Sequence, residues 1–345
     1  MTAKKILKSL RIILSFLIAI YLIRFVIKSN DVDVAQVWRD VDRRYLAAAF
    51  LALGVGFFLA AYRWYILLHH IQVELSLAVV LRLALIGQFF NLFVPGGVGG
   101  DLIKAFYLRK DSGPKFAEAL LTVLLDRILG LTGLLLLALL ALGFNLSLFS
   151  QSGPEVSAIL AVVAVAGIGG LGVALTFFLW PFLTRFSEQF QALNNKLPSK
   201  VQGIAERVVS AFSLLRSSPL KVGLLLLFAM GGHLFATLSV CFLGLGYGGV
   251  ATVDFEQFLL VTQMSNLVAA VPLTPGGLGG RDLIMSFLLG LSGASEKAQG
   301  AIPLCVTSIL ILWSCIGGFA LLWEKKAHPD EVDPGDGEGE SKLAI

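Results

Sequence analysis

A glycine-rich segment occurs twice in this sequence inside apolar regions, as Asn91-Leu-Phe-Val-Pro95-Gly-Gly-Val-Gly-Gly100-Asp101-Leu-Ile103 and as Pro275-Gly-Gly-Leu-Gly-Gly280-Arg281-Asp282-Leu-Ile284. A Gln-x-x-Asn pair precedes each copy. Runs of glycine and proline abolish helix, and within hydrocarbon a non-helical backbone is tolerated only where protein or a water-filled cavity satisfies its polar groups. Two such breaks at corresponding positions of two halves point to a substrate site in transporter-like folds. The sequence therefore predicts a duplicated membrane fold.

The two copies are related but differ in length. Five more residues separate Asn266 from Pro275 than separate Asn91 from Pro95, and Arg281 is an additional residue before the second aspartate. The order of the three blocks is nevertheless the same in both copies. This shared order favours an internal repeat over chance similarity.

The composition is that of a multi-spanning membrane protein. Hydrophobic residues make up 57% of the 345 positions, charged residues 14%, and the mean hydropathy is +0.83, whereas about 25% of an average soluble domain is charged. Stretches near the length of a membrane span, about 20 residues, lie at 10–27, 45–68, 76–94, 117–143, 156–183, 221–245, 256–273 and 300–323. We predict an all-α polytopic bundle in one integral-membrane domain, 1–326, followed by a disordered acidic cytoplasmic tail, 327–345.

Lysine and arginine positions indicate how the segments cross, because short cytoplasmic loops carry an excess of both residues. The N-terminal segment with Lys4 and Lys5 and the basic segment 185–221 would lie on opposite sides if all eight segments crossed. The conflict disappears if each Pro-Gly-Gly segment is a re-entrant hairpin that returns to the side from which it entered. The sequence then predicts six full spans and two re-entrant helical hairpins, with 28–44 as one basic loop left outside.

This topology makes the two halves inverted repeats. Repeat one, about 1–145, has a hairpin that enters from the cytoplasm, and repeat two, about 156–326, has one that enters from outside. Both termini are then cytoplasmic, and the N-terminal apolar run is read as an uncleaved signal anchor. In many secondary transporters of this plan, broken helices from the two halves meet near the midplane and access alternates between the two sides.

The residues after each glycine run are expected to begin a short helix at membrane depth. Asp101 and Asp282 are suited to cap these helices, whose N-terminal amides favour a phosphate or carboxylate. Lys104 and Arg281 add cationic donors for a head group, or each pairs only with its neighbouring aspartate. The amides at 88, 91, 263 and 266 stand at i, i+3 on one helix face, where they line a cavity or hydrogen-bond a neighbouring helix.

Asp126 and Arg127 carry charge deep inside the segment 117–143. They lie about ten residues into it, about 15 Å along a helix and near the middle of a bilayer about 30 Å thick. Each therefore needs a partner on another helix, for which Arg82 and Asp101 are candidates. A structural ion pair and a substrate or proton site are both consistent with this position. Arg63 lies nearer a segment end, from which its side chain can reach the interface.

The predicted substrate-binding residues come from the two breaks, the helices around them and this charged pair. They are Gln88, Asn91, Pro95, Gly96, Gly97, Gly99, Gly100, Asp101, Lys104, Asp126, Arg127, Gln263, Asn266, Pro275, Gly276, Gly277, Gly279, Gly280, Arg281 and Asp282. The alternative for the glycines is an architectural role, in which small residues permit close packing. Neither break has the pattern of a Walker A loop or a dinucleotide-binding fingerprint.

Several of these motifs resemble the lysylphosphatidylglycerol synthetase/flippase transmembrane family, which includes the membrane half of the bacterial multiple peptide resistance factor. The resemblance covers roughly residues 5–325. It rests on the block from Asn91 to Lys104, on Leu125-Asp-Arg-Ile-Leu-Gly-Leu131, on Arg63-Trp64 and on Pro272-Leu-Thr-Pro-Gly-Gly-Leu-Gly. It implies a multi-pass, lipid-related protein of a bacterial-type cytoplasmic (inner) membrane.

Two departures from the family pattern limit what the resemblance implies. Fused members carry a C-terminal cytoplasmic domain that makes the aminoacyl lipid, whereas this chain ends in a short acidic tail, so we expect no synthase activity. Many relatives are also expected to have a glutamate after the second glycine run, where this chain has Arg281-Asp282.

The leading hypothesis is a lipid transporter or flippase that moves a phospholipid or a lipid-linked head group by alternating access. Its expected partners are membrane lipids with anionic or lipid-linked head groups. The alternative is a membrane subunit or scaffold for a lipid-modifying enzyme, such as a separate lipid aminoacyl- or glycosyltransferase. No Ser-His-Asp, Cys-His or metal-ligand spacing supports catalysis, so we expect no catalytic residue, metal or cofactor, and no nucleic-acid partner. His233 is the single histidine within a span and is read as a packed, hydrogen-bonded residue rather than a proton relay.

Overall fold

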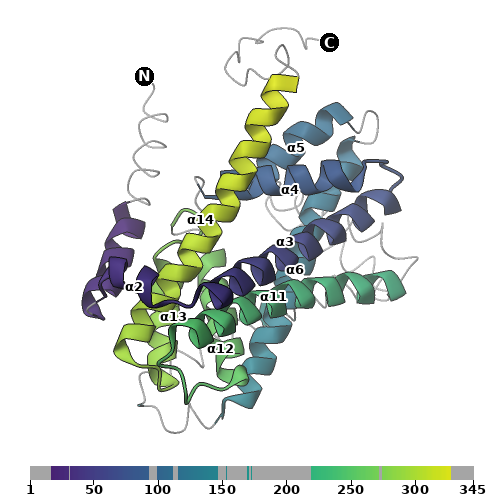
Figure 1. Cartoon of the computed structure of the whole chain (residues 1–345). Helices are drawn as coiled ribbons and strands as arrows, with labels where there is room; N and C mark the ends of the chain where they lie inside the picture. The colour runs from purple at the N-terminus through teal and green to yellow at the C-terminus, as the bar shows by residue number, and fades with distance from the viewer. Residues whose placement is uncertain are drawn as a thin grey trace, which may run out of the picture.

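The structure, a computed structural model, describes residues 17–30, 32–92, 99–111, 116–146, 219–271 and 274–327, with the isolated residues 153, 169, 170 and 172. Every regular element within these ranges is a helix (Figure 1), as the sequence predicts. Most of the predicted span 156–183 and the tail beyond Ala327 lie outside the described residues.

Four helices of the described part are long and apolar enough to cross a membrane: α3 (Arg43–His70), α6 (Phe116–Phe144), α11 (Pro219–Tyr247) and α14 (Glu296–Ala327). They coincide with four of the predicted apolar segments. Helix α3 has 28 residues and is therefore about 42 Å long at a rise of about 1.5 Å per residue, enough to cross a hydrocarbon core of about 30 Å. The prediction of a helical membrane protein with several spans is confirmed.

Each glycine-rich break joins two shorter helices that pack against each other. Helices α4 (Leu77–Asn91) and α5 (Gly99–Asp111) flank the first break, and α12 (Phe255–Ala270) and α13 (Gly280–Leu291) flank the second. They contain 12 to 16 residues and are about 18–24 Å long, shorter than the hydrocarbon core. The expected new helix after each glycine run is confirmed.

A helix over residues 17–29 precedes α2 (Val34–Asp40), and the described residues between them are not helical. The Asp33 carboxylate accepts hydrogen bonds from the backbone N–H groups of Ala35 and Gln36 at 2.8 and 3.3 Å. Asp33 is thus the N-cap of α2, a local structural role.

Helices α3 and α11 lie side by side and run in opposite directions (Figure 1). At one end the N–H of Asp42 donates to the carbonyl of Gly246 at 2.9 Å, and at the other end Lys221 Nζ lies 3.2 Å from His70 Nδ1. Glycine permits the close approach, because a Cβ on Gly56 would lie 3.0 Å from the carbonyl oxygen of Gly232.

Much of the remaining packing forms corresponding pairs around α3 and α11, while α6 also packs on α11. Helix α4 packs on α14, while α12 packs on α6. Helix α3 contacts α4 and α6, while α11 contacts α12 and α14. The α4–α5 pair lies at the upper right of Figure 1 and the α12–α13 pair at the lower left. Both pairs are therefore held against a long helix from the other part of the chain.

Candidate functional site

Asn91 closes the first hairpin at the start of α5. Its Oδ1 accepts a hydrogen bond at 2.7 Å from the backbone N–H of Gly100, one of the N-terminal amides that a helix leaves without an internal partner. The helices approach closely there, because a Cβ on Gly100 would lie 2.6 Å from the carbonyl oxygen of Gly87. Glycine at position 100 therefore serves the helix crossing, as the architectural interpretation expects.

The second break needs glycine for its backbone conformation. Gly276, Gly277 and Gly279 have φ angles of +57°, +72° and +77°, which residues with a Cβ rarely adopt. A Cβ on Gly277 would also lie 2.4 Å from the Cβ of Ala269 on α12. This break is thus a tightly folded turn that packs on the preceding helix.

Asp282 caps α13, as the sequence predicts. Its Oδ2 accepts from the N–H of Gly279 at 2.8 Å, and the N–H of Arg281 donates to the carbonyl of Gly277 at 3.0 Å. These amides, like that of Gly100, are used within the protein. Recognition of a ligand at the helix starts would therefore fall mainly to charged side chains.

The second break meets the end of α4 in the structure. A Cβ on Gly276 would lie 3.6 Å from both the carbonyl oxygen of Asn91 and the Cα of Leu92. Residues about 185 positions apart in the sequence are thus in van der Waals proximity.

Asp126 of α6 lies between two cations from other helices. Its Oδ1 accepts a hydrogen bond from Arg63 Nε at 2.8 Å, and its backbone carbonyl accepts one from Arg63 Nη2 at 3.1 Å. Lys104 Nζ lies 3.9 Å from Asp126 Oδ2 and 4.5 Å from the centroid of the Trp64 ring. Arg63 and Asp126 are only 6% and 9% exposed. A charge this deeply buried is tolerable when it is paired and hydrogen-bonded.

The partner of Asp126 is thus Arg63, which differs from the expectation that Arg63 extends towards the membrane interface. The reason is electrostatic: a buried carboxylate at membrane depth holds the guanidinium inside more strongly than water outside attracts it. The sequence pair Arg63-Trp64 carried a signal for this position, because it is one of the motifs on which the resemblance rests.

Arg127 pairs with Asp101, one of the two partners that the sequence suggests. Arg127 Nε donates to Asp101 Oδ2, and the two side chains are 44% and 24% exposed. This pair joins the first turn of α5 to α6. It lies next to the Asp126 cluster but is much more open.

The second hairpin has a smaller and more deeply buried polar cluster. Arg281 Nη2 donates to Thr307 Oγ1 at 2.7 Å, and Thr307 Oγ1 donates to Asp282 Oδ1 at 2.6 Å. Arg281 also lies 3.6 Å from Asp282 Oδ1, so it pairs with its neighbouring aspartate. No sequence pattern singles out Thr307, which is an ordinary hydroxyl residue in an apolar segment.

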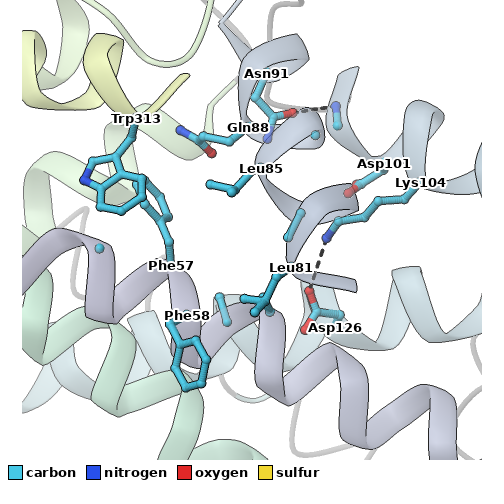
Figure 2. A pocket seen from close by; sticks show the side chains of 16 residues that line it. Phe57, Phe58, Leu81, Leu85, Gln88, Asn91, Asp101, Lys104, Asp126 and Trp313 are labelled. Carbon is cyan, nitrogen blue, oxygen red and sulfur yellow. Dashed lines mark hydrogen bonds and ion pairs between the residues drawn. The ribbon is translucent and has the colours of Figure 1, made fainter. Parts of the chain in front are cut away.

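A cavity of about 300 Å³ lies beside the first hairpin. Figure 2 shows Asp101, Lys104 and Asp126 on one side of it and the rings of Phe57 and Trp313 on the other. Gln88 and Asn91 also line it. The cavity thus combines charged and amide groups with aromatic surface.

A larger cavity of about 660 Å³ is lined by both halves of the chain. Its first-half wall includes Asn91, Asp101 and Asp126, which it shares with the smaller cavity, and its second-half wall includes Asn266 and Arg281. The rest of the wall is mainly apolar, from helices α3, α6, α11, α12 and α14. An apolar space with a few convergent polar groups is the usual form of a ligand site.

The predicted site residues differ in where they lie. Gln263 is fully buried and donates to Thr237 Oγ1 at 2.9 Å, which is the helix-bonding alternative for this amide. Pro95, Gly96 and Gly97 lie outside the described residues. Those that line one or both cavities are Gln88, Asn91, Gly100, Asp101, Lys104, Asp126, Arg127, Asn266 and Arg281.

His233 also lines the larger cavity, and its Nε2 lies 3.2 Å from the carbonyl oxygen of Gly130. This hydrogen bond to α6 agrees with the interpretation of His233 as a packed helix residue. Over the described ranges, His, Cys, Asp and Glu side chains form no group of three that could hold a metal ion.

Residues 12–317 match the family model described as the lysylphosphatidylglycerol synthase TM region. The chain belongs to this family. Among its relatives is a UPF0104 membrane protein of Pyrococcus horikoshii, 26% identical over 83% of this chain and 88% of the relative. Two UPF0104 membrane proteins of Methanothermobacter thermautotrophicus are 22% and 23% identical, over 82% and 81% of this chain and 84% and 85% of the relatives. The chain is therefore a multi-pass membrane protein of the lysylphosphatidylglycerol synthase TM region family.

Proposed function

We propose that this protein moves a phospholipid or a lipid-linked head group from one side of its membrane to the other. The observation that carries the proposal is the larger cavity, in which the charged residues of both hairpins lie at the edge of a mainly apolar space. A lipid has the same division, because a polar head group is attached to apolar chains. The ion pairs of the described residues contain seven charged side chains on α3, α5, α6 and α13. Charges at membrane depth are costly to keep, which favours a use for them beyond packing.

The proposal includes six full spans and two re-entrant hairpins, arranged as inverted repeats with both termini cytoplasmic. Helices α4, α5, α12 and α13 are each shorter than the hydrocarbon core, which supports re-entrant hairpins. Contacts between helix ends support the proposed assignment of loops to the two sides of the membrane. Lys221 contacts His70 on the proposed cytoplasmic side. On the proposed outer side, the N–H of Ser295 donates to the carbonyl of Gly249 at 2.8 Å.

The corresponding contacts of the two halves support the repeat. If α3 to α6 correspond to α11 to α14, the packing of α4 on α14 corresponds to that of α12 on α6. The two hairpins meet at Asn91 and Gly276, as expected for broken helices on either side of a shared substrate path.

Cysteine accessibility tests the topology. In a variant without the native Cys241, Cys305 and Cys315, we expect single cysteines at Lys110 and Lys325 to react with an impermeant maleimide only from the cytoplasmic side. Cysteines at Thr252 and Lys297 should react only from outside. Labelling of Lys110 and Lys325 from opposite sides would overturn the inverted arrangement.

Reconstitution tests the transport. Purified protein in liposomes with fluorescent phospholipids should increase the rate at which inner-leaflet label moves to the outer leaflet, where external dithionite reduces it. Ala236→Phe, which fills the wall of the larger cavity, should slow this exchange at least about tenfold. The matched control is Leu227→Phe, because Leu227 is 66% exposed on the same helix. A folded Ala236→Phe protein with wild-type exchange would refute a path through this cavity.

The subunit or scaffold hypothesis makes the opposite prediction. Purified protein would then move none of the tested lipids and would co-purify with a separate transferase. In that case Ala236→Phe and Leu227→Phe should leave lipid modification in cells equally unaffected.

A further inference from the structure

The smaller cavity, beside the first hairpin, is lined by polar atoms that have no hydrogen-bond partner within the described part of the chain. The side-chain amide of Gln88 is one such group. Lys104 Nζ lies over the Trp64 ring and 3.9 Å from Asp126 Oδ2, which is longer than a hydrogen bond of about 2.7–3.2 Å. Buried polar groups normally have hydrogen-bond partners, so these atoms call for an explanation such as a ligand or water.

The first hairpin brings these groups to one place. Asn91 of α4 accepts a hydrogen bond at 2.7 Å from the N–H of Gly100, which holds the end of α4 next to Asp101 at the start of α5. Gln88 lies one helical turn before Asn91, and Lys104 lies one turn after Asp101. All five residues line the same cavity of about 300 Å³. This volume is at the lower end of the range for small-molecule sites, about 300–1,000 Å³, so the cavity suits one head group rather than a complete lipid.

The free atoms include both hydrogen-bond donors and acceptors. Lys104 Nζ carries three N–H donors, and the Gln88 amide has two donors and an acceptor oxygen. Asp126 Oδ2 is an acceptor that stays open, because Arg63 donates to Oδ1 of the same carboxylate. A ligand that fits this wall therefore accepts hydrogen bonds at some atoms and donates them at others.

Hydroxyl groups meet this requirement better than charged groups do. Each hydroxyl both donates and accepts. An ionised phosphate has only acceptor oxygens, and the carboxylates of Asp101 and Asp126 beside it would repel it. A quaternary ammonium has no N–H or O–H group, so it would leave the donors of Gln88 unfilled and would be repelled by Lys104. A neutral polyol fills donors and acceptors and leaves the ion pairs as they are.

The opposite side of the cavity is apolar. The rings of Phe57 and Trp313 lie there, across from Lys104 (Figure 2). A sugar ring has a matching division, with hydroxyls at its edge and C–H groups on its faces, for which aromatic side chains offer apolar surface. Asp101 and Asp126 also line the larger, mainly apolar cavity. An apolar chain attached to the sugar would therefore have space next to this cavity.

We infer that the smaller cavity is a subsite for a head group rich in hydroxyls, such as a single sugar, and that Gln88, Lys104 and Asp126 recognise these hydroxyls. The inference rests on the proposed function for the source of the sugar, a lipid head group. A free sugar shares the chemistry, and the test separates the two sources.

Binding to the purified full-length protein tests the subsite, in a detergent without a sugar head group because an alkyl glycoside would compete. The probes are a short-chain diacylglycerol that carries one glucose, the same lipid with its glucose hydroxyls methylated, short-chain phosphatidylcholine and phosphatidylglycerol, and free methyl glucoside. One hydrogen bond changes an affinity about two- to tenfold. We expect the glucosyl lipid to bind at least about tenfold more tightly than its methylated form and than phosphatidylcholine, because several hydrogen bonds are lost together.

Two variants remove the recognising groups one at a time. Gln88→Leu removes the amide at nearly constant size, so it should weaken the glucosyl lipid about fivefold and leave both the methylated lipid and the unfolding midpoint unchanged. Lys104→Met keeps the side-chain stem and should weaken the glucosyl lipid about tenfold, while Asp126 stays paired with Arg63. The matched control is Gln36→Leu, the same chemical change at an exposed position of α2, which should bind every probe like the wild type.

Three results would count against the inference. Equal binding of the glucosyl lipid and its methylated form would overturn the subsite. Tighter binding of phosphatidylglycerol that inorganic phosphate displaces would also overturn it, because the site would then take an anion. Methyl glucoside that binds as tightly as the glucosyl lipid would keep the recognition of hydroxyls but would overturn a lipid as their source.

The outcomes separate this inference from the proposed function. Binding that depends on the glucose hydroxyls and on Gln88 would support the subsite even if the purified protein moved no lipid in liposomes. Conversely, movement of phospholipids by a protein that does not distinguish the two glucosyl lipids would overturn the subsite and leave the proposed function in place.

Discussion

The two glycine-rich hairpins have the same architecture but different chemistry. In the first, Asp101 at the start of α5 pairs with Arg127 of α6, 26 residues later. In the second, Asp282 at the start of α13 accepts from Thr307 of α14, 25 residues later. The same helix-to-helix connection is therefore an open ion pair in one half and a buried hydroxyl contact in the other. Two similar helix pairs can thus keep the same connection to the next helix while their side chains differ in charge and exposure.

The difference extends to the surrounding positions. Lys104 lies three residues after Asp101, and Met285 lies three residues after Asp282. On the next helices, Asp126 directly precedes Arg127, and Val306 directly precedes Thr307. The first hairpin is surrounded by the cations Arg63, Lys104 and Arg127 and by the carboxylates Asp101 and Asp126. The second is surrounded mainly by apolar side chains, with the pair of Arg281 and Asp282 as the exception. The charged side chains thus gather around the first hairpin.

The largest expected effect comes from Asp126. Replacement by Asn leaves Arg63 and Lys104 without a counter-charge, and breaking a buried pair in this way costs about 3–5 kcal/mol. The free energy of unfolding by SDS in mixed micelles measures the loss. Arg63→Met/Asp126→Leu removes both charges and should recover most of the stability. If Asp126→Asn lost less than the double variant, the pair would not be buried as described.

The second-largest difference in stability should come from alanine at the last glycine of each run, which is Gly100 in the first hairpin and Gly280 in the second. A Cβ on Gly100 would lie 2.6 Å from the carbonyl oxygen of Gly87, whereas one on Gly280 would have its nearest neighbour, Val268 Cγ1, at 3.6 Å. Gly100→Ala should cost about 1–3 kcal/mol, as overpacking does. Gly280→Ala should be neutral or stabilising, by up to about 1 kcal/mol, because alanine favours helix. Equal thermal stability of the two variants would contradict the difference in helix crossing.

The two asparagines of the repeat provide a smaller contrast. Asn91→Ala removes the side chain that caps α5 and should cost about 1 kcal/mol. Asn266 borders the larger cavity, so Asn266→Ala should change stability less and lipid binding more. Unfolding midpoints and binding of phosphatidylglycerol to both variants measure the contrast, and equal losses of stability would argue against a special role for Asn91.

The smallest expected effect is that of the open ion pair. Arg127 is 44% exposed at its side chain, and exposed pairs contribute about 0.2–1 kcal/mol. Arg127→Gln should therefore lower the unfolding free energy by no more than about 1 kcal/mol. A loss as large as that of Asp126→Asn would show that Arg127 is buried in the membrane-embedded protein and that the two pairs act as one network.

The class of protein, the apolar helices and the two breaks could be predicted from the amino-acid sequence alone. Hydrophobic length fixes which segments can lie in a bilayer, and glycine with proline fixes where a helix ends, so both follow from local chemistry. The sequence also showed that Asp126 and Arg127 need partners, because unpaired charge at that depth is too costly. The inverted arrangement and the span count stay predictions.

Which charges meet became clear from the three-dimensional packing of the helices. Arg63 pairs with Asp126 across 63 positions, Arg281 is held by Thr307, and Gly276 lies against Asn91. Such pairings depend on how the helices cross, and a local pattern does not specify a crossing. The physical reason is that a side chain's partner is set by the packing of whole helices, whereas its need for a partner is set by its own charge and depth.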